Sequence, residues 1–265
     1  MTTTAPTTLK ITPVSGQIGA AIEGVDLREV GPDQVGPLID AIHEHGVVFF
    51  PGQDLTPADH LRFAKLLGTI RMPHALLDSM TDEGLPEIGV IASDQGGIYS
   101  DHWHSDVTWT ETPCRYSILH MQVLPEAGGD TMWSSQYLAY ETLSAPLRSM
   151  LTGLTARHEI GTGAGAVHPV VIQHPATGRK ALFVNSYFTK RILELEQAES
   201  DALLPMLFAN ATRPEFTCRR RWVPGELAVW DNHFVQHYAL HDYGAARRRI
   251  HRIEIEGEPP VPARS

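Results

Sequence analysis

Three side chains able to bind a metal stand at alternating positions in the segment DHWHSDVTW, residues 101–109. They are His102, His104 and Asp106. In a β-strand, side chains at positions i, i+2 and i+4 point to the same face, so an extended backbone would let all three approach one ion. Two histidines and one carboxylate on one side of a metal are typical of non-haem Fe(II) oxygenases. The segment therefore predicts a metal site, although periodicity alone leaves open which of the three residues are ligands.

A second group of candidate residues lies near the C-terminus, in WDNHFVQHYALHDYGAARRRIHR. His237 would supply the distant ligand that a site with two histidines and one carboxylate needs. Arg248 and Arg252 share a face if RRRIHRIEI is a strand, whereas Arg247 and Arg249 would point away from it. Two buried guanidinium groups are costly unless anions meet them. We therefore expect two anions there, a dicarboxylate co-substrate and the substrate itself.

Short strands must position most of these candidates. The run VVFFPGQ reads as a buried strand, β-like runs alternate with turn residues from Leu85 to Leu124, and four strands are expected late in the chain, in EFTCRRRW, ELAVW, FVQHYAL and RRRIHRIEIE. The small-residue segment IGTGAGAVHP, residues 160–169, predicts a flexible lid. Strands in both halves with helices between them predict a mostly β fold with flanking helices.

Helices are expected at about 33–44, 56–68, 137–151 and 197–211. The second has the clearest signals, with Thr56 as N-cap, Pro57 at the first helical position and Gly68 at its end. The fourth contains Pro205, which a helix interior tolerates poorly. We expect one domain over residues 1–265, with about the first ten residues disordered.

Composition narrows the class of protein. The chain of 265 residues is 42% hydrophobic and 20% charged, which is typical of globular proteins. A net charge of −10 argues against nucleic acid or an anionic membrane surface as a partner. The chain shows neither a run of 18 apolar residues nor a signal-peptide pattern. Cys114 and Cys218 are expected to be reduced, which favours a cytoplasmic protein.

Several segments, in a fixed order, resemble the taurine dioxygenase/TfdA-type family of 2-oxoglutarate-dependent oxygenases. They are GAAIEGVDL, VVFFPGQ, WHSDVTW, GGDTMW, HPVVIQHPATGRKALFVN, WDNHFVQHYA and RRRIHR, and the resemblance runs from about Ile18 to Glu256. It implies a double-stranded β-helix, or jelly-roll, core. It also implies Fe(II), 2-oxoglutarate and O2 as cofactor and co-substrates, and assembly into a dimer or tetramer.

The resemblance implies specific roles for five residues. Fe(II) would be held by His104, Asp106 and His237. Arg248, helped by Thr131, would bind the distal carboxylate of 2-oxoglutarate. The expected reaction is hydroxylation of a small anionic substrate, such as a sulfonate, an alkyl sulfate or an aryloxy or alkyl carboxylate, with succinate and CO2 as co-products. The intact carboxylate of Asp106 favours hydroxylation over halogenation.

Substrate contacts are assigned to five further residues. Arg252 would hold the anionic group of the substrate, and His74 and Phe188 match substrate-contacting positions of taurine-type members. Ser100 stands where some relatives have an amide side chain. His102 is expected to face the substrate or support the pocket, because the cupin pattern that would make it a ligand requires a glutamate where Thr and Trp stand.

Residues 157–167, RHEIGTGAGAV, are shorter than the lid of related enzymes and contain no aromatic residue. This difference favours a more open or differently closed pocket. The same chemistry could also serve an amino acid or a natural-product intermediate, with Arg252 binding a carboxylate. Outside this chemistry, the alternatives are a cupin-like metal isomerase and a non-catalytic β-helix protein that binds a small acid.

Overall fold

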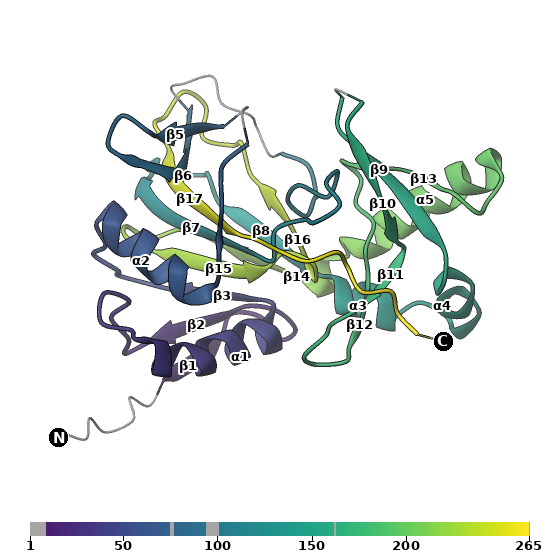
Figure 1. Ribbon diagram of the computed structural model, residues 1–265, viewed down its shortest axis with the longest axis horizontal. Coiled ribbons are helices and arrows are strands. Elements are labelled where there is room, and N and C mark those ends of the chain that lie inside the picture. The colour runs from purple at the N-terminus through teal and green to yellow at the C-terminus, as the bar shows by residue number, and fades with distance from the viewer. Residues whose placement is uncertain (1–8, 75–76, 94–100, 162, 265) are drawn as a thin grey trace.

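The computed structural model describes residues 9–74, 77–93, 101–161 and 163–264 (Figure 1). Of the ten N-terminal residues predicted to be disordered, 1–8 lie outside the described residues. Lys10 begins the first strand, so the prediction extended too far at its end.

The main sheet contains nine strands among the described residues. Eight follow the order β1-β2-β3-β15-β7-β17-β6-β5, and β4 pairs with β17. Their bounds are β1 (Lys10–Pro13), β2 (Ala20–Glu23), β3 (Val47–Phe50), β4 (Ile70–Arg71), β5 (Asp78–Met80), β6 (Leu85–Ala92), β7 (Tyr116–Val123), β15 (Leu227–Asp231) and β17 (Arg249–Ile255). Every pairing in this sheet is antiparallel except that of β2 with β3.

A smaller antiparallel sheet faces the main one. Its order is β14 (Thr217–Arg220), β8 (Thr131–Ser135) and β16 (Val235–Ala239). Phe49 and Trp230 of the main sheet share a buried core with Trp133 and Val235 of the smaller sheet. Two facing, mainly antiparallel sheets with side chains from both filling the space between them form a sandwich, in agreement with the jelly-roll core that the family resemblance implied.

Two helices cover the outer face of the main sheet, α1 (Val35–His45) and α2 (Pro57–Leu67) (Figure 1). The four residues VVFF of β3 pack on both faces of the main sheet. Val48 and Phe50 pack in the cluster under these helices, whereas Val47 and Phe49 pack between the two sheets. This division follows from strand alternation, and it explains why all four residues are apolar and buried.

The remaining elements form the other half of the molecule (Figure 1). They comprise a three-stranded sheet of order β10-β9-β13, a two-stranded sheet of β11 and β12, and three helices. Their bounds are β9 (Thr155–Glu159), β10 (Gly165–Pro169), β11 (Val171–Gln173), β12 (Lys180–Leu182), β13 (Thr189–Ile192), α3 (Gln136–Glu141), α4 (Ala145–Leu151) and α5 (Gln197–Ala211). A separate hydrophobic cluster lies between these helices and strands.

Short 3-10 helices precede α1 at Pro32–Gln34 and β14 at Pro214–Phe216. The first helix prediction therefore holds, with a 3-10 turn at its start. The second holds in detail, because Thr56 caps α2 by accepting a hydrogen bond from the Asp59 backbone N–H at 3.2 Å. The fourth holds as α5, which continues through Pro205.

The single helix predicted for 137–151 is wrong. The structure has two helices there, with a break at residues 142–144. Pro146 explains the break, because proline lacks the N–H that would continue the helix and is favoured in a first turn. The lid predicted for 160–169 also requires correction. Residues 165–169 form β10, which pairs with β9 as a hairpin.

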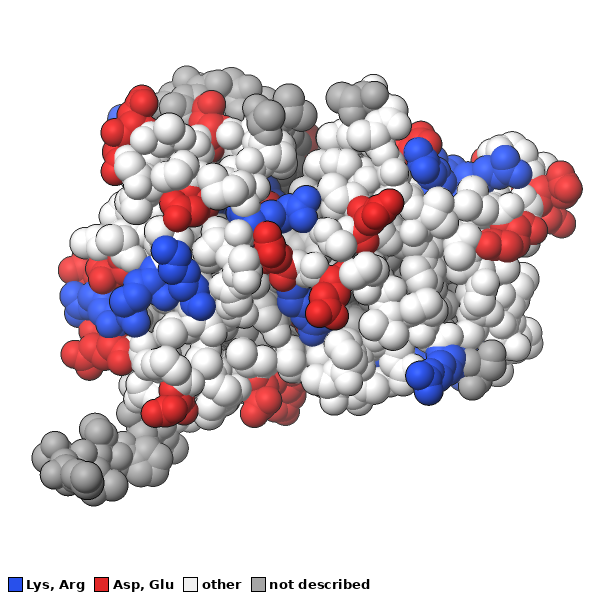
Figure 2. All heavy atoms as spheres, viewed as in Figure 1, with Lys and Arg blue, Asp and Glu red and all other residues white. Residues whose placement is uncertain are grey.

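Within the described residues, every helix is too short or too polar to cross a bilayer. Cys114 and Cys218 are buried and free. Acidic and basic side chains are interspersed over the face shown in Figure 2. Surface pairs such as Arg28 and Asp26, 2.7 Å apart and partly exposed, stabilise a fold weakly. The charged groups of the candidate site are buried instead.

Candidate metal centre and co-substrate cavity

His104, Asp106 and His237 lie together between the two facing sheets. Asp106 Oδ1 is 3.5 Å from His104 Nε2 and 3.8 Å from His237 Nε2. One ligand atom from each residue lies within 4.8 Å of the others, and all three residues are buried. Two imidazole nitrogens and one carboxylate oxygen at this spacing fit a divalent transition metal held on one side.

Backbone pairing brings the two histidines together across 133 positions of sequence. The His104 N–H donates to the His237 carbonyl at 3.1 Å, and the His237 N–H donates to the His104 carbonyl at 2.8 Å. This antiparallel bridge joins the 101–109 segment to β16. The main chain therefore holds the two residues directly opposite one another.

Residues 102–106 do not form the extended strand that would bring all three side chains to one face. Apart from the bridge at His104, the segment turns, and Val107 has a φ of 50°. A β-branched residue in the left-handed region is strained, and such strain is typical of functional sites. The turn is held by the Thr110 N–H and hydroxyl, which both donate to the Val107 carbonyl. It directs the Asp106 carboxylate back toward His104.

Two buried residues hold Asp106 in place. Asn232 Oδ1 accepts from the Asp106 N–H at 2.6 Å, and Asn232 Nδ2 donates to the Asp106 carbonyl at 3.0 Å. The Ser117 hydroxyl donates to Asp106 Oδ2 at 2.7 Å. With Oδ2 engaged by Ser117, Oδ1 is the atom directed at the histidines. Such supporting contacts orient metal ligands.

The protonation states suit metal binding. Burial and the nearby His104 lower the pKa of His237 to about 3, so its imidazole is neutral at pH 7. Burial alone would raise the pKa of Asp106, but the charge of Arg252 holds that pKa well below its ordinary value. His104 Nδ1 lies 2.7 Å from the His102 carbonyl oxygen, so Nδ1 carries the hydrogen and Nε2 presents its lone pair.

The side chain of His102 lies apart from this cluster. It is about half exposed, its Nδ1 is 2.9 Å from Asp101 Oδ1, and its ring lies 4.8 Å from that of Tyr187. Among the three residues at alternating positions, only His104 and Asp106 converge with His237. The backbone of His102 still contributes, because its carbonyl orients the His104 ring.

A cavity opens beside His237 and is lined by Thr131, Arg248 and Arg252. Arg248 is buried, and its Nε donates to the Gly129 carbonyl at 3.0 Å. Burial lowers the pKa of this guanidinium, which signals a charge in need of an anion. Thr131 Oγ1 accepts from Trp222 Nε1 at 3.0 Å, so its own hydrogen remains available to donate.

Arg252 lines the same cavity as Arg248, as strand alternation in β17 predicted. Its Nη2 donates to Asp106 Oδ1 at 3.0 Å and to Glu254 Oε1. Burial acts to lower the pKa of Arg252, but the charges of Asp106 and Glu254 raise it above the ordinary value. The guanidinium therefore stays charged next to the candidate metal centre.

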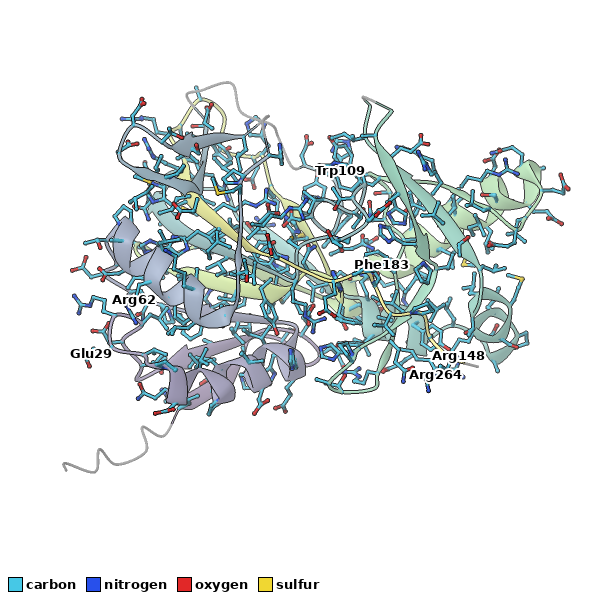
Figure 3. All side chains as sticks on the ribbon, in the orientation of Figure 1. Glu29, Arg62, Trp109, Arg148, Phe183 and Arg264 are labelled. Carbon is cyan, nitrogen blue, oxygen red and sulfur yellow. The ribbon has the colours of Figure 1, made fainter. Side chains whose placement is uncertain are left out.

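Aromatic rings border the other side of His104. The Phe188 ring is 6.0 Å from the His104 ring and 4.7 Å from that of Trp109. Trp109, labelled in Figure 3, stands between the jelly-roll core and the β10-β9-β13 sheet. His74 is half-buried with its ring 5.9 Å from that of Trp109. Ser100 lies outside the described residues.

Two other groupings of possible ligands occur among the described residues. In the first, His43, His174 and Asp231 approach one another, but Arg115 Nη2 lies 2.6 Å from His174 Nε2 and 2.8 Å from Asp231 Oδ2. The guanidinium takes the place that a cation would need. The second consists of Asp106, Cys114 and Glu254. There the Arg252 guanidinium already pairs with both carboxylates.

Sequence reasoning missed Asn232, Ser117 and Glu254. Glu254 could have been predicted from the sequence, because strand alternation places positions 248, 250, 252 and 254 on one face. Asn232 follows β15 directly and Ser117 lies in β7. Their approach to Asp106 depends on chain segments more than ten residues away, which no local pattern reveals.

Known proteins resemble this chain over nearly its whole length. The family model "Taurine catabolism dioxygenase TauD, TfdA family" matches residues 10–253. An alkylsulfatase of Acinetobacter baylyi is 34% identical over 94% of this chain and 86% of its own. A sulfate ester dioxygenase of Pseudomonas putida, dependent on alpha-ketoglutarate, is 36% identical over 97% of this chain and 93% of its own.

Solved structures agree with these sequence matches. A taurine dioxygenase from Burkholderia xenovorans superposes with a TM-score of 0.88 at 37% identity, covering 97% of this chain and 94% of its own. This match confirms the predicted fold, and the sequence matches confirm the predicted enzyme class. The chain belongs to the taurine catabolism dioxygenase TauD, TfdA family.

Proposed function

We propose that this chain, acting as one domain, is an Fe(II)- and 2-oxoglutarate-dependent dioxygenase that hydroxylates a small organic anion. The observation that carries the proposal is the convergence of His104, Asp106 and His237 next to a cavity lined by two buried arginines. Family membership argues against the cupin-like isomerase and the non-catalytic binding protein. Neither alternative accounts for a metal triad together with Arg248.

The three residues His104, Asp106 and His237 would hold Fe(II) through Nε2, Oδ1 and Nε2. When bound, Fe(II) would supply the redox chemistry by which O2 and 2-oxoglutarate are converted to succinate and CO2 while a substrate C–H bond is hydroxylated. The protein contributes orientation. Ser117 orients the carboxylate of Asp106, and Asn232 holds its backbone. The backbone bridge holds His104 beside His237.

Arg248 and Thr131 would bind the distal carboxylate of 2-oxoglutarate. A carboxylate facing the Arg248 guanidinium would gain charge-assisted hydrogen bonds in a buried setting, where they are strong. The Thr131 hydroxyl would add a second donor, because its oxygen already accepts from Trp222. The Gly129 carbonyl orients the arginine by accepting from Nε.

Arg252 would bind the anionic group of the primary substrate, and His74 and Phe188 would contact its carbon skeleton. The best-supported substrate class is a sulfate ester or sulfonate, because relatives matched over almost the full chain carry those names. Hydroxylation of the carbon that bears a sulfate ester gives an unstable product. That product would separate into an aldehyde and sulfate.

The first experiment tests the metal and co-substrate sites together. Anaerobic addition of Fe(II) and 2-oxoglutarate should give a weak visible charge-transfer band in the wild type and in His102→Ala. The band should be lost in His104→Ala. Soluble wild-type protein without the band, or a His104→Ala variant that retains it, would refute the proposal.

A second experiment identifies the substrate class. Alkyl sulfates, sulfonates, aryloxyalkanoates and amino acids are supplied in turn with Fe(II), 2-oxoglutarate and O2, and succinate formation is measured. We expect an alkyl sulfate or sulfonate to stimulate succinate formation most strongly. Stimulation by amino acids alone would replace the proposed substrate class while leaving the reaction type in place.

A further inference from the structure

Arg252 is shared between two buried carboxylates. Its Nη2 donates to Asp106 Oδ1 at 3.0 Å and also to Glu254 Oε1. Its Nε is buried and has no hydrogen-bond partner among the described residues. One nitrogen of the guanidinium is thus engaged inside the protein, another is buried without a partner, and the side chain as a whole lines the cavity.

Burying the carboxylate of Glu254 at this position costs free energy. It is 4% exposed, and it shares the inward face of β17 with Arg248 and Arg252, while Ile253 and Ile255 pack under the outer helices. Besides Arg252, the thiol of Cys114 contacts Glu254 Oε1 at 3.3 Å. A buried carboxylate is unfavourable unless it is paired, and the triad, Arg248 and Thr131 would complete the chemistry described above without it.

Glu254 adds a second negative charge beside the guanidinium of Arg252. The single positive charge of Arg252 faces the negative charges of Asp106 and Glu254. If Glu254 were neutral, Arg252 would face one carboxylate only. Each additional negative charge brought by a ligand therefore meets repulsion from Glu254, and at low dielectric that repulsion acts strongly over short distances.

We propose that Glu254 restricts the substrate site to monoanionic head groups by compensating part of the charge of Arg252. A sulfate monoester or sulfonate carries one charge and suits the donors that Arg252 has left. A phosphate monoester has a similar shape but carries close to two charges near neutral pH. This inference rests on the proposed function, because it assumes that Arg252 binds the substrate anion.

The experiment compares two ligands that differ mainly in charge. Hexyl sulfate and hexyl phosphate are titrated into the anaerobic protein with Fe(II) and 2-oxoglutarate at about pH 8, where the phosphate is a dianion, and the two Kd values are measured by calorimetry. The proteins are the wild type, Glu254→Gln, and Glu256→Gln as a matched control. Glu256 is an exposed carboxylate just beyond the same strand.

The wild type should bind hexyl sulfate at least about tenfold more tightly than hexyl phosphate, because a second charge is opposed at close range. Glu254→Gln keeps the size of the side chain and removes its charge, so the ratio of the two Kd values should fall by about tenfold. Glu256→Gln should leave the ratio unchanged. An unchanged ratio in Glu254→Gln would overturn the inference.

Further outcomes keep the inference testable. If Glu254→Gln does not fold, Glu254→Asp keeps the charge and should keep the preference for the sulfate. Equal or tighter binding of the phosphate by the wild type would itself refute the inference. Binding of neither ligand by the wild type would refute the proposed substrate class, and the inference with it, whereas sulfate binding with an unchanged ratio in Glu254→Gln refutes the inference alone.

Discussion

The side-chain amide of Asn232 hydrogen-bonds to both backbone polar groups of Asp106. Oδ1 accepts from the N–H at 2.6 Å, and Nδ2 donates to the carbonyl at 3.0 Å and to the Cys114 carbonyl at 3.1 Å. Asn232 thus takes the place of a neighbouring strand at the point where the chain turns into the strained Val107. The amide holds one candidate ligand in register with the other two.

Asn232→Ala should therefore weaken metal binding more than it weakens the fold. Contacts that orient a ligand are worth about tenfold to a hundredfold in metal affinity, and we expect a loss in that range in an anaerobic Co(II) titration followed by visible absorption. Asn210→Ala is the control, since Asn210 Nδ2 donates to the Ala139 carbonyl far from the site. Equal Co(II) affinity in the two variants would show that Asn232 has only a structural role.

Substitutions of Arg248 and Arg252 should have different effects on the steady-state kinetics. Arg248→Ala should raise the KM for 2-oxoglutarate much more than the KM for the primary substrate, and Arg252→Ala should do the reverse. Loss of a buried charge-assisted contact costs about 2–5 kcal/mol, so the affected KM should rise by at least about tenfold. If each variant changed both KM values equally, the two anion sites would be wrongly assigned.

Acid should destabilise the protein through His233. This residue is 4% exposed, and burial lowers its pKa from 6.5 to about 4, despite the opposing charge of Asp231. Because the folded-state pKa is the lower one, the unfolded chain binds the proton first. The contribution of His233 to the free energy of unfolding is therefore fully present above about pH 6.5. It falls as the pH approaches 4, by at most about 3 kcal/mol.

Urea denaturation at several pH values measures this dependence. His233→Gln can still donate to the Pro113 carbonyl, which His233 Nε2 contacts at 3.3 Å, but it does not titrate. The variant should lose less stability between pH 6.5 and 4 than the wild type. The same slope in both proteins would contradict the assignment of the effect to His233.

Two glycines should respond differently to alanine. A Cβ at Gly257 would lie 2.0 Å from the Pro113 carbonyl oxygen, so Gly257→Ala forces the backbone apart and should cost at least about 1–3 kcal/mol. Gly36 lies in α1 with nothing within 4 Å of an added Cβ. Gly36→Ala should change stability by less than about 1 kcal/mol, because the gain in helix propensity is opposed by contact of the new Cβ with the ring of Pro37. Thermal unfolding measures both changes, and an equal loss of stability in the two variants would be inconsistent with this packing.

Local sequence signals were sufficient where a structure depends on neighbouring residues. Thr56, Pro57 and Asp59 set the start of α2, because capping involves atoms within one turn. Alternation placed Arg248 and Arg252 on one face of β17, because the pleat has a period of two. Local signals were insufficient at residues 160–169, part of which pairs with the neighbouring β9 as a hairpin, and at residues 102–106, where a turn and a single bridge to the distant His237 replace a regular strand.

The sequence by itself determined the family, the jelly-roll fold and the set of residues able to bind a metal and two anions. Resemblance to the family had already named His104, Asp106 and His237 as the metal set, and only the tertiary structure decided how they are brought together. His104 lies against His237 because two distant backbone segments exchange hydrogen bonds, and the Asp106 carboxylate turns toward both because Ser117 holds the carboxylate and Asn232 holds the backbone. Contacts of this kind join residues far apart in the chain, so they exist only once the two sheets have closed on one another.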